Sequence, residues 1–139
     1  AIWPATAHNY TSKTQYLFRI NKGILDNTND KDLNAFTPEH MRRVPFTNMI
    51  YIGDGLTDVP CMKLTRLKGG FSIAVYPPGQ SKVADDMLMQ KRVDYAVPAD
   101  YRPGGELEAA VSLVFGRIRA THDCTVLHDA QARRVRQSP

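Results

Sequence analysis

The sequence has little cysteine and no long hydrophobic run. Its two cysteines, Cys61 and Cys124, are far apart and lack the spacing of metal ligands. They therefore predict free thiols in a reducing cytoplasm, and they exclude a disulfide framework. No apolar stretch approaches the roughly 20 residues of a membrane-spanning helix, and no basic segment followed by an apolar one marks a signal peptide. These absences favour a cytoplasmic protein that does not enter a membrane.

The excess of positive charge is small. The 139 residues carry a net charge of +4, part of which comes from Arg133, Arg134 and Arg136 near the C-terminus. Three arginines with an aspartate nearby are too weak a signal to favour a nucleic-acid partner. The length is sufficient for one domain with a hydrophobic core, and the 42% of hydrophobic residues is ordinary for a globular chain.

A short apolar run that ends in an acidic turn is the most informative stretch. Residues 48–52 are rich in β-branched and aromatic side chains and predict a buried strand. The strand ends at Gly53-Asp54-Gly55, where two glycines permit a sharp turn and leave the space above it open. Asp58 follows at the expected start of a helix. Two carboxylates thus leave the carboxyl end of a strand, where open α/β sheets bind ligands.

This acidic turn has two interpretations. Carboxylate oxygens suit Mg²⁺, which takes one or two carboxylates together with waters and a substrate phosphate. The same spacing also fits a plain tight loop in which Asp58 is the N-cap of the following helix. The short pattern alone leaves both interpretations open.

Strands and helices alternate along the chain. Helices are predicted over residues 12–22, 59–67, 81–90 and 106–118, and strands over 48–52, 71–76 and 94–98. This alternation predicts an α/β fold with a mostly parallel sheet. In the helix over 59–67, Met62, Leu67 and Val59 are expected to face inward.

Several segments lie outside this alternation. Residues 1–7 predict an edge strand or the end of a longer element. Residues 24–46 predict a polar connector in which Asp30-Lys31-Asp32 is a solvated loop. The pattern fades from Thr121 onward, so the sequence divides into a core over residues 1–120 and a basic tail over 121–139 that is a frayed helix or disordered.

The motif Gly-Asp-Gly-x-x-Asp at residues 53–58 resembles the fourth motif of the haloacid dehalogenase-like (HAD) hydrolases, which are mostly Mg²⁺-dependent phosphatases. The resemblance covers residues from about 1 to about 115. It implies a Rossmann-like three-layer α/β/α core, with Asp54 and Asp58 as catalytic and Mg²⁺-binding residues and Gly55 at the phosphate of a phosphorylated small molecule.

HAD phosphatases also carry a phosphate-binding lysine upstream of the acidic turn, and this chain offers Lys13 and Lys22. In a right-handed strand–helix–strand unit, the N-terminus of the helix lies at the carboxyl ends of the strands. Lys13 is in the first turn of its predicted helix and is therefore the expected phosphate ligand. Lys22, in the last turn, is expected to complement the helix dipole at the opposite end.

The Asp-x-Asp pattern of the HAD nucleophile is missing. No such pattern follows an apolar strand, and the Ser or Thr of the second motif has no convincing position among the twelve residues before Lys13. The resemblance therefore implies the C-terminal part of a HAD core, with first and second motifs absent. Such a chain holds the electrostatic half of the site, and we expect it to have negligible phosphatase activity alone.

The resemblance also implies that the acidic strand pairs with the strand that carries the nucleophile, and this sequence shows no such strand. Residues 50–52 would become an apolar sheet edge, which favours pairing with another chain, and we expect a homo-oligomer. The competing functional interpretation is a non-catalytic α/β interaction module derived from a HAD hydrolase. A receiver-like domain is disfavoured, because its lysine would have to follow a later strand.

Overall fold

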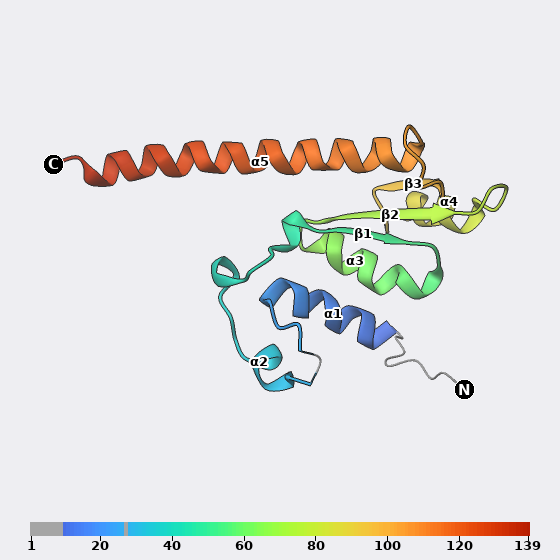
Figure 1. Cartoon of the computed structure of the whole chain (residues 1–139), viewed down its shortest axis with the longest axis horizontal. Coiled ribbons are helices and arrows are strands. Elements are labelled where there is room, and N and C mark those ends of the chain that lie inside the picture. The colour runs from blue at the N-terminus through green and yellow to red at the C-terminus, as the bar shows by residue number, and fades with distance from the viewer. Residues whose placement is uncertain (1–9, 27) are drawn as a thin grey trace. The chain divides into compact units, whose positions relative to one another are not determined.

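The computed structural model describes residues 10–26 and 28–139 (Figure 1). The chain forms two compact units, Ala1–Asp100 and Tyr101–Pro139. Residues 106–137 form one continuous helix, which passes through the boundary that the sequence predicts at residue 120. The strand predicted over residues 1–7 lies outside the described residues.

A parallel sheet organises the first unit. Its strands β1 (Ile50–Gly53), β2 (Phe71–Tyr76) and β3 (Tyr95–Pro98) lie in the order β1-β2-β3, and each is parallel to its neighbour. The predicted α/β class and the parallel sheet are confirmed. The sequence predicts a buried strand here. β1 instead lies at the edge of the sheet and is only partly buried, because no described strand pairs with its outer side. The complete three-layer Rossmann-like arrangement stays a prediction.

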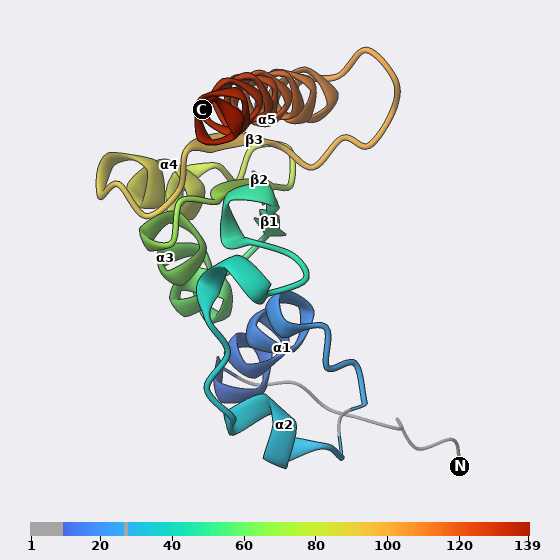
Figure 2. The same cartoon turned by 90° about the vertical axis from the view of Figure 1, so that its left-hand side faces the viewer.

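Two crossover helices cover one face of the sheet. α3 (Val59–Leu67) connects β1 to β2, and α4 (Lys82–Met89) connects β2 to β3. Both lie on the same side of the strands (Figure 2). Their buried side chains form one apolar cluster with the sheet, made of Met62, Ala74, Ala84, Met87 and Val93. This cluster holds α3 and α4 against the sheet.

The inward face of α3 differs in part from the prediction. Met62 is fully buried as expected, and Val59 is half-buried. Leu67 is 82% exposed and so contradicts the prediction. The buried face of the helix contains Cys61 and Thr65, which are four residues apart. At 3.6 residues per turn, position 67 points away from that face.

α1 (Tyr10–Lys22) packs beside α3 and begins two residues earlier than predicted (Figures 1 and 2). A second apolar cluster joins the two helices, the start of β1 and a 3₁₀ turn over Phe46–Asn48. Its buried members are Leu17, Phe46, Met49 and Cys61. The N-terminal half of α1 is thereby held close to the carboxyl end of β1.

The connector between α1 and β1 contains a short helix that begins earlier than the helical turn that the sequence predicts over residues 33–36. Asp30-Lys31-Asp32, predicted as a solvated loop, opens the short helix α2 (Asp30–Asn34). The side chain of Asn29 caps this helix by accepting a hydrogen bond from the amide of Asp32 at 3.2 Å. The buried guanidinium of Arg19 forms an ion pair with Asp30 at 2.5 Å and anchors the same end.

The second unit consists mainly of α5 (Glu106–Gln137). The helix predicted to end at 118 continues through the segment expected to be a frayed or disordered tail. No proline interrupts residues 106–137, and the single Gly116 lowers helix propensity by only about 1 kcal/mol. Acidic residues in the first turn and arginines in the last turn also complement the helix dipole. None of the described helices is long and apolar enough to cross a membrane.

Candidate functional site at the carboxyl end of β1

The acidic turn connects β1 to α3 directly. Gly53 ends the strand, Leu56–Asp58 form a 3₁₀ turn, and α3 begins at Val59. Asp54 is exposed at this turn, whereas Asp58 is buried. The two carboxylates of the motif are therefore in different environments, and their chemistry must differ accordingly.

Asp58 accepts hydrogen bonds from four protein donors. Its Oδ1 accepts from Lys13 Nζ at 2.8 Å and from the Tyr51 hydroxyl at 2.7 Å. Its Oδ2 accepts from the backbone amides of Asp54 at 3.1 Å and Gly55 at 3.3 Å. A carboxylate has about four acceptor positions, so Asp58 is saturated by protein groups. It holds the turn and the lysine in place, and a metal ion could bind it only by displacing one of these donors.

Asp58 does not act as a simple helix cap. Although it precedes α3, its side chain makes no capping hydrogen bond to that helix. The carboxylate reaches back to the amides of the turn instead. The interpretation of Asp58 as an ordinary N-cap of α3 therefore does not describe its contacts.

Lys13 is the lysine that the structure brings to the turn. Its Nζ forms an ion pair with Asp58 and donates a second, longer hydrogen bond to Thr57 Oγ1 at 3.3 Å. Lys22 lies at the other end of α1, where its Nζ donates to the carbonyls of Leu33 and Ala35. The two lysines therefore lie at the ends of α1 at which the sequence predicts them. The phosphate-binding role of Lys13 stays a prediction.

The surroundings of Lys13 and Asp58 favour the charged form of each group. The hydrogen bond to Asp58 raises the pKa of Lys13 above its ordinary value of 10.5, and Asp54 makes a smaller contribution in the same direction. Burial alone would raise the pKa of Asp58, but the hydrogen bonds from Lys13 and Tyr51 outweigh it, and the pKa falls below 3.8. Burial and the hydrogen bond to Asp58 raise the pKa of Tyr51. The amine and the carboxylate are therefore both charged at neutral pH.

The two glycines of the turn have different roles. A Cβ atom on Gly53 would lie 2.6 Å from Asp58 Oδ2, so only glycine allows the carboxylate to pack against the end of the strand. Gly55 has an extended backbone, with φ −153°, and no atom lies within 4 Å of the position of its Cβ. The sequence predicted that both glycines serve a sharp turn, whereas the structure requires only Gly53, for close packing. The space above Gly55 is open, as expected.

The carboxylate of Asp54 remains available at the rim of a cleft. Among the described residues, its side chain accepts no hydrogen bond and forms no ion pair. Asp54 and Gly55 line a cleft of about 380 Å³ together with Tyr76 and Pro77 from the carboxyl end of β2. No group of three or more potential metal-ligating side chains occurs in residues 10–26 and 28–139. Asp54 is thus the carboxylate of the motif that is free to bind a ligand.

Two residues of this cluster were missed by the sequence analysis. Tyr51 appeared only as one member of an apolar run, and Thr57 as an unassigned position of the motif. A tyrosine between two isoleucines in a strand is a weak signal, because its ring also fits an apolar core. Its contact with Asp58 depends on how the turn folds back over β1, which the local pattern does not encode.

Comparison with known proteins finds a relative that shares only part of its length with this chain. The chain is similar to an uncharacterized protein of Borreliella burgdorferi, with 32% identity over 101 residues, which are 71% of this chain and 34% of that protein. The chain therefore spans about a third of the length of this relative. No model of a known protein family matches the sequence, and no solved structure matches the chain.

Proposed function

We propose that the first unit binds Mg²⁺ and a phosphoryl group at the carboxyl end of β1, as the electrostatic half of a HAD-type phosphatase site. The observation that carries this proposal is the pairing of a fixed lysine with a free carboxylate at one turn. Lys13 is held by Asp58 at 2.8 Å, while Asp54 stays exposed beside the cleft. In this arrangement Asp54 is the Mg²⁺ ligand, and Asp58 is a positioning residue.

The donor set suits Mg²⁺ with a phosphate and poorly suits Mg²⁺ alone. Mg²⁺ usually keeps several waters and takes one or two carboxylates together with substrate phosphates. Asp54 supplies one carboxylate, the ammonium group of Lys13 supplies positive charge for a phosphate, and the open space above Gly55 leaves room for it. When bound, the ion would neutralise charge on the phosphoryl oxygens, which is the main catalytic contribution in phosphoryl transfer.

Calorimetric titration with MgCl₂ and inorganic phosphate tests the site. We expect wild-type protein to bind phosphate more tightly when Mg²⁺ is present. Asp54→Asn should weaken Mg²⁺ binding at least tenfold, and Asp123→Asn, which removes an exposed charge from α5, should not change it. Lys13→Met should weaken phosphate binding, whereas Lys22→Met is the matched lysine control. Equal binding by wild type and Asp54→Asn would refute the proposed site.

A phosphatase assay distinguishes the proposed half of a site from a complete enzyme. Because no Asp-x-Asp pattern follows an apolar strand, we expect no detectable hydrolysis of an aryl phosphate by this chain. Robust Mg²⁺-dependent hydrolysis by the pure chain, lost in Asp54→Asn, would mean that another residue supplies the nucleophile.

The second candidate function is a non-catalytic α/β interaction module. The missing nucleophile pattern and the open side of β1 favour it. Failure of the wild-type chain to bind Mg²⁺ or phosphate would leave this module as the better account.

A further inference from the structure

The free edge of β1 carries unpaired backbone groups. Phe71 N donates to Met49 O at 3.0 Å, so Met49 faces β2. Successive residues of a strand direct their N–H and C=O groups to opposite sides, and Ile50 and Ile52 therefore face away from β2. Within the described part of the chain, no hydrogen bond pairs the outward groups of these two isoleucines with another element.

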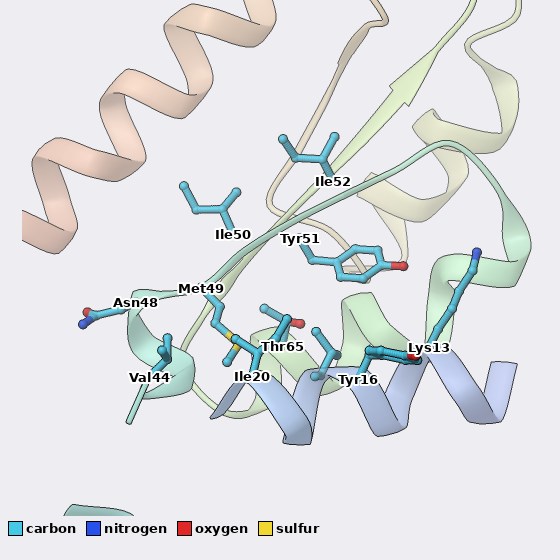
Figure 3. Close-up of a pocket in the computed structure, with 11 residues that line it drawn as sticks. Lys13, Tyr16, Ile20, Val44, Asn48, Met49, Ile50, Tyr51, Ile52 and Thr65 are labelled. Atoms are coloured by element: carbon cyan, nitrogen blue, oxygen red, sulfur yellow. The ribbon is translucent and has the colours of Figure 1, made fainter. Parts of the chain in front are cut away.

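An apolar pocket of about 490 Å³ lies beside this edge, between β1 and α1 (Figure 3). Residues 48–52 line one side of the pocket, and Tyr16, Leu17 and Ile20 of α1 line the other. The side chain of Ile52 is 41% exposed and that of Ile20 is 42% exposed. The pocket therefore combines an apolar wall with a row of backbone donors and acceptors.

We propose that this edge binds an extended apolar segment of polypeptide from outside residues 1–139, which adds a strand to the sheet next to β1. Strand addition gives affinity through main-chain hydrogen bonds, and pockets select alternate side chains. A purely hydrocarbon ligand would fill the same pocket but would bury the N–H and C=O groups of Ile50 and Ile52 without partners, which is unfavourable. The outward backbone groups thus favour a peptide over a lipid-like ligand.

Two observations favour an external segment over a second copy of this chain. First, α1 lies across the pocket from β1 (Figure 3). A second copy paired through its own β1 would bring its own α1 to the same gap. A single extended segment needs much less room. Second, about two thirds of the Borreliella burgdorferi relative lies outside the region it shares with this chain, so that protein has further polypeptide beside the shared part.

The probe is a seven-residue peptide in which valine alternates with threonine between two terminal lysines. Its matched control is the same peptide with N-methyl groups on every valine and threonine, which removes the N–H donors from both edges of the peptide and so prevents strand pairing. Binding is followed by the hydrogen exchange of the Ile50 and Ile52 amides measured by NMR. We expect exchange at both amides to slow at least tenfold with the first peptide at saturation and to stay unchanged with the second.

A variant of the chain provides the complementary test. Ile52→Pro removes an N–H that faces the open edge and leaves the ladder to β2 intact, because proline is tolerated at sheet edges. It should weaken peptide binding at least tenfold, whereas Ile52→Val keeps the N–H and should bind like wild type. If Ile52→Pro does not fold, which circular dichroism would show, the pair of peptides on the wild-type chain decides alone.

The remaining outcomes contradict the proposal. Unchanged exchange at both amides with the first peptide would show that the edge does not accept a strand. Equal binding of the methylated peptide would show contact without strand pairing. Slow exchange without peptide, together with a dimer in sedimentation, would assign the edge to the second copy expected from the sequence. Asp54→Asn should leave peptide binding unchanged, so a failure here is distinguishable from a failure of the Mg²⁺ site.

Discussion

The hydroxyl of Tyr51 donates a hydrogen bond to Asp58 Oδ1 at 2.7 Å and so ties the middle of β1 to the start of α3. The same oxygen accepts from Lys13 Nζ, which makes Asp58 the common partner of the strand, the turn and α1. A carboxylate shared among three elements orients the lysine more firmly than a single ion pair on the surface, because exposed pairs are weak and mobile.

Removing the Tyr51 hydroxyl should loosen this arrangement. Tyr51→Phe keeps the ring in the apolar cluster and deletes one hydrogen bond to a charged acceptor, which stabilises proteins by about 1.5–3 kcal/mol. We expect the free energy of unfolding in urea to fall by about 1–2 kcal/mol, since the hydroxyl is only partly buried. Tyr95→Phe, on β3, is the matched control and should change it by less. An unchanged unfolding midpoint for Tyr51→Phe would contradict the contact.

The two glycines of the turn should respond differently to alanine. In Gly53→Ala, the new Cβ would collide with Asp58 at 2.6 Å, so the carboxylate must move away from the amides that it accepts from. We expect a loss of about 2–4 kcal/mol in unfolding free energy, as for other buried hydrogen-bond networks that are broken. Gly55→Ala has open space and an extended backbone, and its stability should stay within about 0.5 kcal/mol of wild type. Similar losses for both variants would refute the packing role assigned to Gly53.

The pair of Lys13 and Asp58 makes stability depend on pH in two windows. The pKa of Asp58 is lowered on folding, so its contribution is present above 3.8 and is lost as pH falls through the lower folded value. The pKa of Lys13 is raised, so its contribution is present below 10.5 and is lost as pH rises through the higher folded value. Chemical unfolding between pH 2 and 11 should therefore show a loss of stability at both ends.

Asp58→Asn provides the control for this pH dependence. Its unfolding free energy should be about 2 kcal/mol lower than that of wild type at pH 7, because two hydrogen bonds to a charged group are weakened. The difference should shrink as pH falls from 3.8 through the lower folded pKa of Asp58, and as pH rises from 10.5 through the higher folded pKa of Lys13. A difference that stays constant from pH 2 to 11 would mean that the ion pair does not contribute.

The two cysteines should react at very different rates. Cys61 is completely buried in α3, with its Sγ 3.8 Å from Thr14 Oγ1, whereas Cys124 is exposed on α5. A thiol reagent added to native protein should therefore modify one cysteine quickly, and Cys124→Ser should abolish this fast phase. In urea, both cysteines of the wild type should react. Fast modification of Cys61 in the native state would contradict the packing of α1 on α3.

Much of the fold could be predicted because the relevant signals are local. The apolar runs and glycines bound α3 and β2 at the predicted residues, Val59–Leu67 and Phe71–Tyr76. The errors arose where a local signal was weak or absent. α5 continued past residue 118 because nothing in its sequence stops a helix before Ser138, and α2 formed because Asn29 caps it.

The candidate site was predictable only in part. The motif gave the positions of Asp54 and Asp58, and the direction of α1 favoured Lys13 over Lys22. The sequence treated the two aspartates alike as metal ligands. The structure distinguishes them, because Asp58 receives four donors from α1, β1 and the turn while Asp54 receives none among the described residues.

By itself, the sequence determined the order of strands and helices and the acidic turn at the carboxyl end of β1, because these depend on neighbouring residues and on the period of apolar side chains. Only the tertiary structure decided that Tyr51 and Lys13 share one carboxylate, that Gly53 must lack a side chain, and that an apolar pocket accompanies the open edge of β1. Those features depend on residues up to 45 positions apart in the chain, and no local pattern encodes such distances.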